Sequence, residues 1–188
     1  MLKIAEIIIF IKTMPATHAH IPVTRLAPAP GTAQATMTDL REFLAFKIGN
    51  EEYGVDILRV QEIRSYEKPT TIANATGELQ GVMNLRGVIV PIIDLRLKLG
   101  QTAVQYDPLK VVIVLNIGQR MVGAVVDGVS DVLTLEREQM RPMPALRGDI
   151  APEHLLAIGS VGQRMLILLD IEKFLANSVA SGTPAACH

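Results

Sequence analysis

The sequence predicts a mostly β protein made of two tandem copies of a small β-barrel, followed by a short C-terminal helix. Two observations carry this prediction. Short apolar runs rich in Val and Ile are bounded by turn residues, and the order of these runs occurs twice along the 188 residues. Closing such short strands into barrels removes sheet edges that would otherwise be exposed.

A hairpin and a third strand open the predicted globular part. Residues 43–48 are apolar with partial alternation, residues 49–52 read Gly-Asn-Glu-Glu, and residues 53–57 form a second apolar run. Tight turns favour glycine and asparagine, so the two runs are predicted to pair. Residues 60–64 mix apolar and polar side chains, which predicts a half-exposed third strand.

Segment 84–96 is the most informative part of the chain. An Asn-Leu-Arg-Gly turn leads into the apolar run 88–93, which predicts a strand buried on both faces. We expect Pro91 at a sheet edge or bulge, because proline cannot donate to a ladder. Arg86 lies on the turn directly before the strand, which favours a contact surface over a catalytic site. Residues 95–99 are predicted to form a turn of helix ended by Gly100.

The same order of strands occurs again downstream. Residues 111–117 predict a strand, 118–120 a turn and 121–126 the returning strand. One constant shift along the chain aligns Gly54 with Gly123, Val60 with Val129, and Glu62 with Asp131. A slightly larger shift aligns 89–95 with 165–171, and the extra residues fall in a proline-containing loop. A long unit that occurs only twice indicates duplicated domains rather than a solenoid.

The predicted globular domain covers residues 38–177, with a subdomain boundary near 105–110 across which strands could exchange. Apolar residues at helical spacing predict a helix at 171–177, before a disordered tail at 178–188. Residues 1–37 are interpreted as a disordered or mis-annotated leader, because prolines are scattered among Ala and Thr there. The apolar run at 7–11 is too short to span a membrane, and the preceding Glu6 argues against a signal peptide.

The composition excludes several classes of function. Apolar residues make up 49% and charged residues 20% of the chain, which is typical of a globular protein. The net charge of -1 leaves no basic excess for phosphates, so we expect no nucleic-acid partner. Cys187 is the single cysteine, which rules out a disulfide framework and a cysteine-based zinc site and fits a reducing cytoplasm.

No catalytic constellation can be assembled from the sequence. His154 is the only histidine within the predicted globular part, and the glycines form neither a dinucleotide fingerprint nor a P-loop. We therefore expect no enzyme activity, no cofactor and no metal. A small β-barrel enzyme or ligand carrier is the alternative of a different class, and the lone histidine argues against it.

Charged residues within apolar strand contexts point instead to a binding module. Glu62 and Arg86 have two interpretations, which the sequence leaves open. They could pair with each other and satisfy local geometry, or they could flank an apolar contact surface that contains Val60 and Val88.

Residues 43–174 resemble the CheW family of bacterial chemotaxis coupling proteins. The resemblance lies in six segments at 52–58, 60–64, 81–91, 111–115, 125–132 and 164–168. It implies two SH3-like five-stranded β-barrels without catalytic activity. It also implies an adaptor that bridges transmembrane chemoreceptors to the histidine autokinase CheA, whose regulatory domain has the same fold. The departures lie mainly in residues 146–154 and in the leader.

The resemblance also implies two sets of site residues. Those similar to the family's receptor-binding positions are Val60, Glu62, Ile63, Gly81, Arg86 and Val88. Those similar to its kinase-facing positions are Val112, Asp127, Gly128, Val129, Ser130 and Asp131. Val112 is also interpretable as a core residue, and Gly81 as a turn residue with positive φ.

An adaptor of this family is expected in the cytoplasm, recruited to membrane receptor arrays without inserting into the membrane, with self-association possible there. A scaffold of the same fold that serves twitching motility or second-messenger signalling is the alternative.

Overall fold

Eleven strands and two short α-helices make up the described part of the chain. The computed structural model describes residues 40–73, 77–102, 104–106, 109–143 and 150–180. The predicted leader, most of the predicted tail and residues 144–149 lie outside these ranges. The first strands are β1 (Arg41–Ile48), β2 (Glu51–Asp56), β3 (Val60–Ser65), β4 (Leu79–Leu85) and β5 (Val88–Asp94). The later strands are β6 (Val111–Ile117), β7 (Arg120–Val126), β8 (Gly128–Leu135), β9 (Met140–Arg141), β10 (Leu155–Val161) and β11 (Arg164–Leu169).

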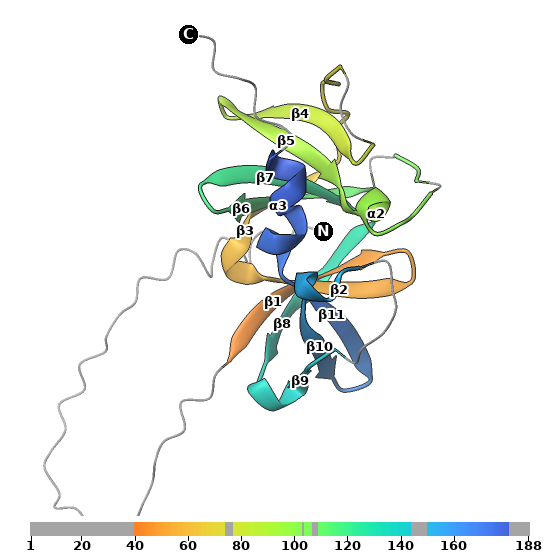
Figure 1. The fold of residues 1–188 in the computed structure, drawn as a ribbon, viewed down its shortest axis with the longest axis vertical. Helices are drawn as coiled ribbons and strands as arrows, with labels where there is room; N and C mark the ends of the chain where they lie inside the picture. Colours follow the sequence, from red (N-terminus) through yellow and green to blue (C-terminus); the bar gives the residue numbers. More distant parts are fainter. Residues whose placement is uncertain (1–39, 74–76, 103, 107–108, 144–149, 181–188) are drawn as a thin grey trace, which may run out of the picture.

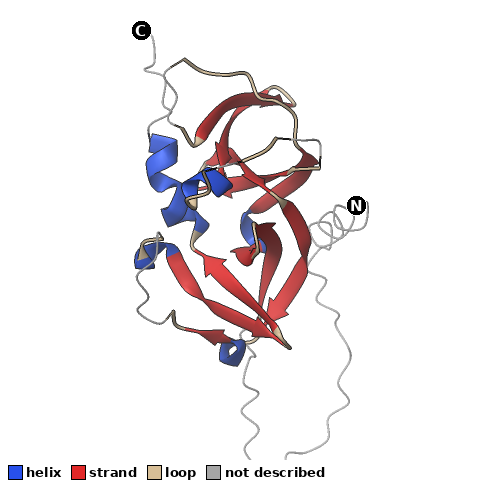
Figure 2. Cartoon of the chain, turned by 90° about the vertical axis from the view of Figure 1, so that its right-hand side faces the viewer, coloured by secondary structure: helices blue, strands red, loops and turns tan. Residues whose placement is uncertain are grey.

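In the part of the chain that the structure describes, helix is confined to short pieces, as the sequence predicts. The α-helices are α2 (Leu95–Lys98) and α3 (Ile171–Ala180), and the 3₁₀ turns are η1 (Ile57–Arg59), η2 (Arg137–Gln139) and η3 (Pro152–His154). The predicted helix at 171–177 is confirmed and extends to Ala180. Figure 2 shows α3 on one side of the stacked strands.

The strands form two sheets, which lie one above the other in Figure 1. The five-stranded sheet has the order β3-β6-β7-β5-β4, and the six-stranded sheet has the order β8-β1-β2-β11-β10-β9. The predicted class, two SH3-like β-barrels, is confirmed. The sixth strand, β9, is not predicted by the sequence. It is a two-residue segment in which Met140 and Arg141 pair with Gly159 and Ile158.

Each sheet combines strands from both halves of the chain. The hairpin β1–β2 pairs with β8 and β11, whereas the hairpin β6–β7 pairs with β3 and β5. The expected boundary near 105–110 therefore does not separate the two sheets. Residues of β1, β2, β6 and β7 also share the largest buried apolar cluster with α3. The two barrels consequently share one core cluster, and each has a smaller apolar cluster of its own.

The sequence repeat is reproduced in the pairing of the strands. In the six-stranded sheet Gly54 lies opposite Leu168, and in the five-stranded sheet Gly123 lies opposite Ile92. These are the positions that the two sequence shifts align. The register shifts match as well. The shift between Leu79 and Gly81 in β4 corresponds to the shift between Leu155 and Ala157 in β10. The repeat is therefore a structural duplication.

Pro91 lies on an inner strand and away from the register shift between Leu79 and Gly81, so the expectation of an edge or bulge position is wrong. The expectation that both faces of this strand are buried is also wrong at Val88 and Ile89, which are exposed. Val82, its partner on β4, bonds through its own N–H and C=O to Thr70. The pair Val82–Pro91 is thus a non-hydrogen-bonded one, and no β4 bond is lost there. On the other side, pairing of β5 with β7 begins only at Ile92. The N–H that Pro91 lacks is therefore not needed for pairing with β4 or with β7.

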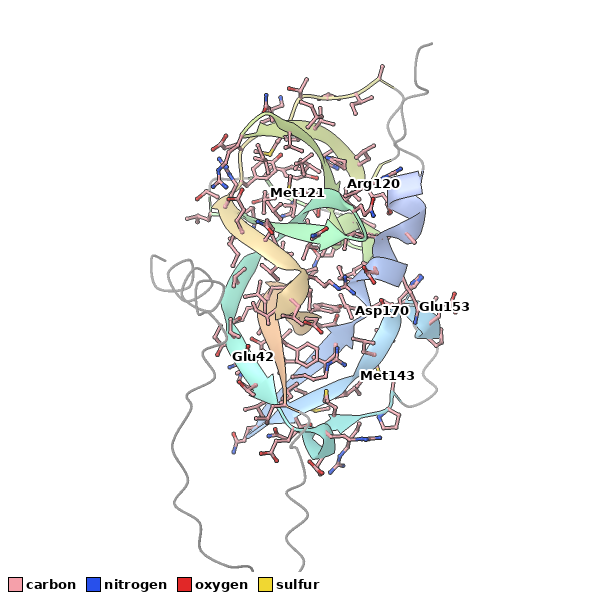
Figure 3. The ribbon with its side chains drawn as sticks, turned by 90° about the vertical axis from the view of Figure 1, so that its left-hand side faces the viewer. Glu42, Arg120, Met121, Met143, Glu153 and Asp170 are labelled. Atoms are coloured by element: carbon pink, nitrogen blue, oxygen red, sulfur yellow. The ribbon has the colours of Figure 1, made fainter. Side chains whose placement is uncertain are left out.

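A short junction orients α3 against the barrels. Asp170, labelled in Figure 3, directly follows β11, and its side chain accepts a hydrogen bond from the Lys173 N–H at 3.2 Å. Its own N–H donates to the His154 carbonyl. Phe174 and Leu175 are buried, which places the apolar face of the helix on the shared core.

Candidate partner-binding surfaces

The β4–β5 turn holds Arg86 in a conformation that few residues adopt. Its φ is 54° and that of Gly87 is 88°, and Leu85 pairs with Val88 across this two-residue turn. Positive φ at both central positions is typical of a type I′ hairpin turn. Asn84 Oδ1 accepts a hydrogen bond from the Gly87 N–H at 2.7 Å, which fixes the turn. Left-handed non-glycine residues are uncommon and concentrate at functional sites.

Arg86 forms an ion pair with Glu62. The Arg86 Nη2 to Glu62 Oε2 distance is 2.8 Å. Glu62 lies on β3 and Arg86 follows β4, and these are the two outer strands of the five-stranded sheet. The ion pair therefore links the two edge strands of the five-stranded sheet. Arg86 is 80% exposed, so the pair adds only about 0–1 kcal/mol to stability.

The two interpretations of Glu62 and Arg86 are compatible. The side chains do pair with each other, and exposed apolar residues follow them directly on β5. Val88 and Ile89 are both exposed, Ile89 to 61%. A charged pair beside exposed apolar side chains is a surface that a partner can contact through both kinds of group.

Two of the predicted receptor-binding residues lie inside the protein. Val60 is fully buried in the shared core. Gly81 is buried with a φ of 140°, and any side chain there would collide with the Thr70 carbonyl. Neither residue can reach a partner directly, so substitutions there would act through packing. Glu62, Ile63, Arg86 and Val88 retain exposed or partly exposed side chains.

Val112 does not lie on a kinase-facing surface either. It is 1% exposed and packs in the apolar cluster of the five-stranded sheet with Val90 and Val125. Both faces of β6 are buried, which is why the core interpretation of Val112 is the correct one.

Asp127 holds structural contacts between the two sheets. Its side chain accepts a hydrogen bond from the Gly49 N–H at 2.7 Å and lies 3.1 Å from Lys110 Nζ and 3.3 Å from Arg96 Nη1. Burial acts to raise its pKa, but the Gly49 N–H and the two cations lower the pKa of Asp127 below its ordinary value. Asp127 therefore belongs to the framework.

The next residues along β8 lie nearer to the surface. Gly128, Val129 and Ser130 are partly exposed. Asp131 pairs with Arg164 at 2.9 Å, and Arg164 also pairs with Glu52 at 2.6 Å. The hydrogen bond from Arg164 lowers the pKa of Glu52. Glu52, Asp131 and Arg164 form one cluster. It lies on the second barrel, which contains the six-stranded sheet, in the region equivalent to that of Glu62 and Arg86 on the first barrel, which contains the five-stranded sheet.

The duplication places matching apolar residues on the two barrels. The larger of the two sequence shifts aligns Ile89 with Met165. Each is the second residue of the strand that follows a hairpin turn. Ile89 is 61% and Met165 64% exposed. Each barrel thus presents a large apolar side chain beside an Arg–carboxylate pair.

The sequence reasoning missed the buried ion pair of Arg96 with Asp94. Arg96 is 1% exposed, and its guanidinium bonds to Asp94 at 2.8 Å and to the Gln105 carbonyl at 2.9 Å. Asp94 also accepts from the Arg96 N–H, as the N-cap of α2. The available signal was the Asp-Leu-Arg sequence that closes the apolar run, because charges directly after a buried strand need partners.

No catalytic arrangement emerges from the described residues. His154, the histidine within the described ranges, packs edge-on against Phe174 with ring centroids 5.5 Å apart. Within those ranges, no three His, Cys, Asp or Glu side chains converge as metal ligands do. None of the helices described there is long and apolar enough to cross a membrane.

The comparisons with known proteins agree with this geometry. The CheW-like domain family matches residues 42–179. The chain belongs to the CheW-like family. It is 61% identical to the chemotaxis protein CheW of Klebsiella aerogenes over 73% of this chain and 82% of that protein. It is 35% identical to a probable chemotaxis protein CheW of Rhizobium etli, over 73% and 89% of the two chains.

A solved structure supports the same assignment. The scaffolding protein TtCheW of Thermoanaerobacter tengcongensis superposes with a TM-score of 0.66 at 26% identity, over 72% of this chain and 92% of that one. The resemblance on which the sequence analysis rested is confirmed. Membership of this scaffold family makes the chain a chemotaxis adaptor and disfavours the other pathways considered above.

Stability is expected to fall in acid because carboxylates of the framework are held ionised. The pKa values of Glu52, Asp127 and Asp170 are all lowered in the folded state from ordinary values of 4.5, 3.8 and 3.8. A lowered pKa contributes stability above the unfolded-state value, and this stability is lost as the pH falls through the folded-state value. The melting temperature should therefore be level near neutrality and fall below about pH 4.5.

Asp127→Asn tests this directly. The variant should be less stable at pH 7 and should lose less stability on acidification than the parent chain. Equal acid slopes for the two proteins in thermal melts would contradict the assignment.

Proposed function

We propose that the chain couples transmembrane chemoreceptors to the histidine autokinase CheA as a non-catalytic adaptor in the cytoplasm. The observation that carries this proposal is the surface around the β4–β5 turn. There the left-handed Arg86 pairs with Glu62 beside the exposed Val88 and Ile89. Membership of a scaffold family supports a role in assembly rather than in catalysis.

The receptor-binding surface is proposed to consist of Glu62, Ile63, Arg86 and Val88. Its apolar residues would accept the apolar face of a receptor helix, and the charged pair would fix the register of that helix. Val60 and Gly81 are buried, so they would influence this surface only through packing.

The kinase-binding surface is proposed to lie on the second barrel. Gly128, Val129, Ser130 and Asp131 border it, and the exposed Met165 and Arg164 extend it. The resemblance gives the kinase regulatory domain the same double-barrel fold. The matching positions of Ile89 and Met165 therefore allow pseudo-symmetric contacts with that domain, or with a second copy of this chain within a receptor array.

Arg86→Asn should weaken binding to a receptor cytoplasmic fragment by about tenfold, because it removes a charge at the centre of the proposed surface. Asparagine tolerates positive φ, so the hairpin turn is kept. Binding of purified proteins by titration calorimetry measures the effect. Arg120→Asn, at the exposed start of β7 (Figure 3), is the matched control and should bind normally.

The kinase arm of the same experiment separates the two surfaces. Arg86→Asn should bind the kinase regulatory domain like the parent chain, whereas Met165→Ser should lose kinase affinity and retain receptor affinity. If a folded Arg86→Asn variant bound the receptor fragment as the parent chain does, the proposed receptor surface would be wrong.

A further inference from the structure

Met165 is the most exposed methionine in the part of the chain that the structure describes. It lies on β11 and is 64% exposed. Met83, Met121 and Met140 are partly buried, because each packs against one of the two smaller apolar clusters, and Met143 is partly buried as well. Met165 packs against none of the three clusters, so its thioether group stands in solvent.

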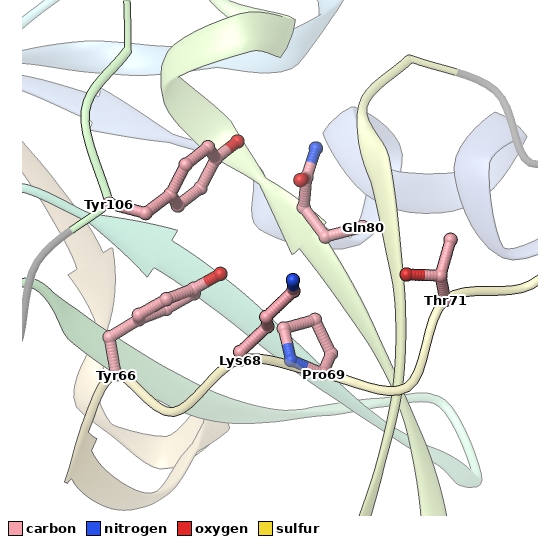
Figure 4. A pocket seen from close by; sticks show the side chains of 6 residues that line it. All are labelled: Tyr66, Lys68, Pro69, Thr71, Gln80 and Tyr106. Carbon is pink, nitrogen blue, oxygen red and sulfur yellow. The ribbon is translucent and has the colours of Figure 1, made fainter.

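Few other side chains of this protein react readily with peroxides. The sequence contains one cysteine, Cys187, and no tryptophan, so one copy of the chain cannot form a disulfide. Tyr66 and Tyr106, which lie side by side in Figure 4, are phenols, and burial raises the pKa of both, which keeps them protonated. A peroxide therefore acts on this chain through sulfur, and Met165 is the sulfur that the described fold leaves most accessible.

The duplication gives Met165 a counterpart that peroxide leaves unchanged. The larger sequence shift aligns it with Ile89, which is exposed to a similar extent, 61%. A hydrocarbon side chain offers no lone pair to an oxidant, whereas a thioether does. The two barrels thus present equivalent apolar residues, of which only the one on the second barrel can become polar by oxidation.

We propose that Met165 is a site of reversible oxidation, and that its oxidation releases the kinase from the adaptor while the receptor stays bound. The sulfur lone pair attacks hydrogen peroxide, the O–O bond breaks, and the products are methionine sulfoxide and water. A methionine sulfoxide reductase restores the thioether by oxidising two thiol groups to a disulfide, with release of water. The effect on binding rests on the proposed function, because Met165 extends the proposed kinase-binding surface.

The physical consequence of oxidation is the loss of an apolar contact. Methionine is flexible and polarizable and is common at binding surfaces that adapt to a partner. A sulfoxide oxygen that is buried against apolar groups without a donor lowers affinity. The neighbouring Arg164 is held by four hydrogen bonds to Glu52 and Asp131, so it is not free to turn and cover the new oxygen.

Mass spectrometry of the full chain tests the site without any partner. The Cys187→Ser variant is treated with millimolar hydrogen peroxide, catalase stops the reaction at intervals, and peptide mapping gives an oxidation rate for each methionine. Met165 should be oxidised several-fold faster than Met83, Met121 and Met140. Reductases for both sulfoxide epimers, supplied with a thiol, should restore the original mass. If Met165 is oxidised no faster than these three residues, the proposal is overturned.

Binding to the kinase regulatory domain tests the consequence. The adaptor is oxidised alone, the peroxide is removed, and the two proteins are then mixed in a calorimeter. Oxidation should weaken kinase binding about tenfold, leave binding of the receptor fragment unchanged, and be reversed by the reductases. Met165→Leu stays apolar and forms no sulfoxide, so peroxide should leave its kinase affinity unchanged.

Two binding results would overturn the proposal. One is an oxidised parent chain that binds the kinase domain as the reduced chain does, and the other is an equal loss of affinity in oxidised Met165→Leu. If the reduced chain fails to bind the kinase domain at all, the proposed function is wrong and the release of the kinase falls with it. The oxidation rates remain a separate measure of the site itself.

Discussion

Arg96→Met is expected to destabilise the fold by about 3–5 kcal/mol, because it leaves a buried carboxylate without its cation. Arg96 and Asp94 are 1% and 0% exposed, and two hydrogen bonds join the guanidinium to the carboxylate. Arg96 also reaches Asp127, which contacts the β1–β2 turn through Gly49. Its loss should therefore loosen the junction between the barrels as well as the strand that carries it.

Denaturant unfolding of the purified variants measures this effect. Arg164→Met removes an arginine with two carboxylate partners that is 39% exposed, so it should cost no more than about 1 kcal/mol. Adding Asp94→Asn to Arg96→Met should recover part of the loss, since asparagine still caps α2 and carries no charge. If Arg96→Met and Arg164→Met lose equal stability, burial of the pair is not what matters.

Gly123→Ala is expected to destabilise the fold by about 1–3 kcal/mol through overpacking. A Cβ atom at Gly123 would lie 2.5 Å from Ile92 Cδ1 and 3.0 Å from Val112 Cγ1. Both neighbours are buried, so a shift of either side chain would disturb the packing around it. The duplication predicts the same outcome for Gly54→Ala, whose Cβ would lie 2.7 Å from Leu168 Cδ2.

Two further variants test whether the contact of a side chain at position 123 is the cause. Gly128 has no positive φ and no atom within 4 Å of a built Cβ, so Gly128→Ala should be neutral or slightly stabilising. Ile92→Val deletes the nearest clashing atom and should offset part of the cost of Gly123→Ala in a double-mutant cycle. Additive effects of the two changes would show that the contact is not the cause.

The contrast between Arg86 and Val60 shows how far sequence reasoning reaches into the candidate site. The turn position of Arg86 is predictable because Asn and Gly flank it, and local residue types decide turn conformation. The prediction that Val60 belongs to the contact surface, near Glu62 in the sequence, is wrong. Two residues apart on a regular strand share a face, but the register of β3 shifts between Val60 and Glu62, so Val60 enters the core while Glu62 stays near the surface. Val112 is different, because both faces of its strand are buried and the sequence already allowed the core interpretation.

The sequence by itself determined the β4–β5 turn, the C-terminal helix, the duplication and most of the strands, namely β1, β2, β3, β5, β6, β7 and β11. These are local properties, since apolar period, glycine and proline act within a few residues of themselves. The two glycines that the repeat aligns also fall at equivalent places in the two sheets. In segment 84–96 the turn and the presence of a strand are predictable from its own residues, whereas the inner position of Pro91, the exposure of Val88 and Ile89 and the burial of Arg96 are not.

Only the tertiary structure decided which of the two barrels each hairpin joins. The hairpins β1–β2 and β6–β7 present the same glycine and the same register, so each is locally compatible with either set of partner strands. The fold exchanges them, and the exchange creates the shared core and the contacts of Asp127 with Gly49 and Arg96. These partners are far apart in the chain, so their contacts depend on how the barrels pack on the shared apolar cluster, and no local pattern specifies them.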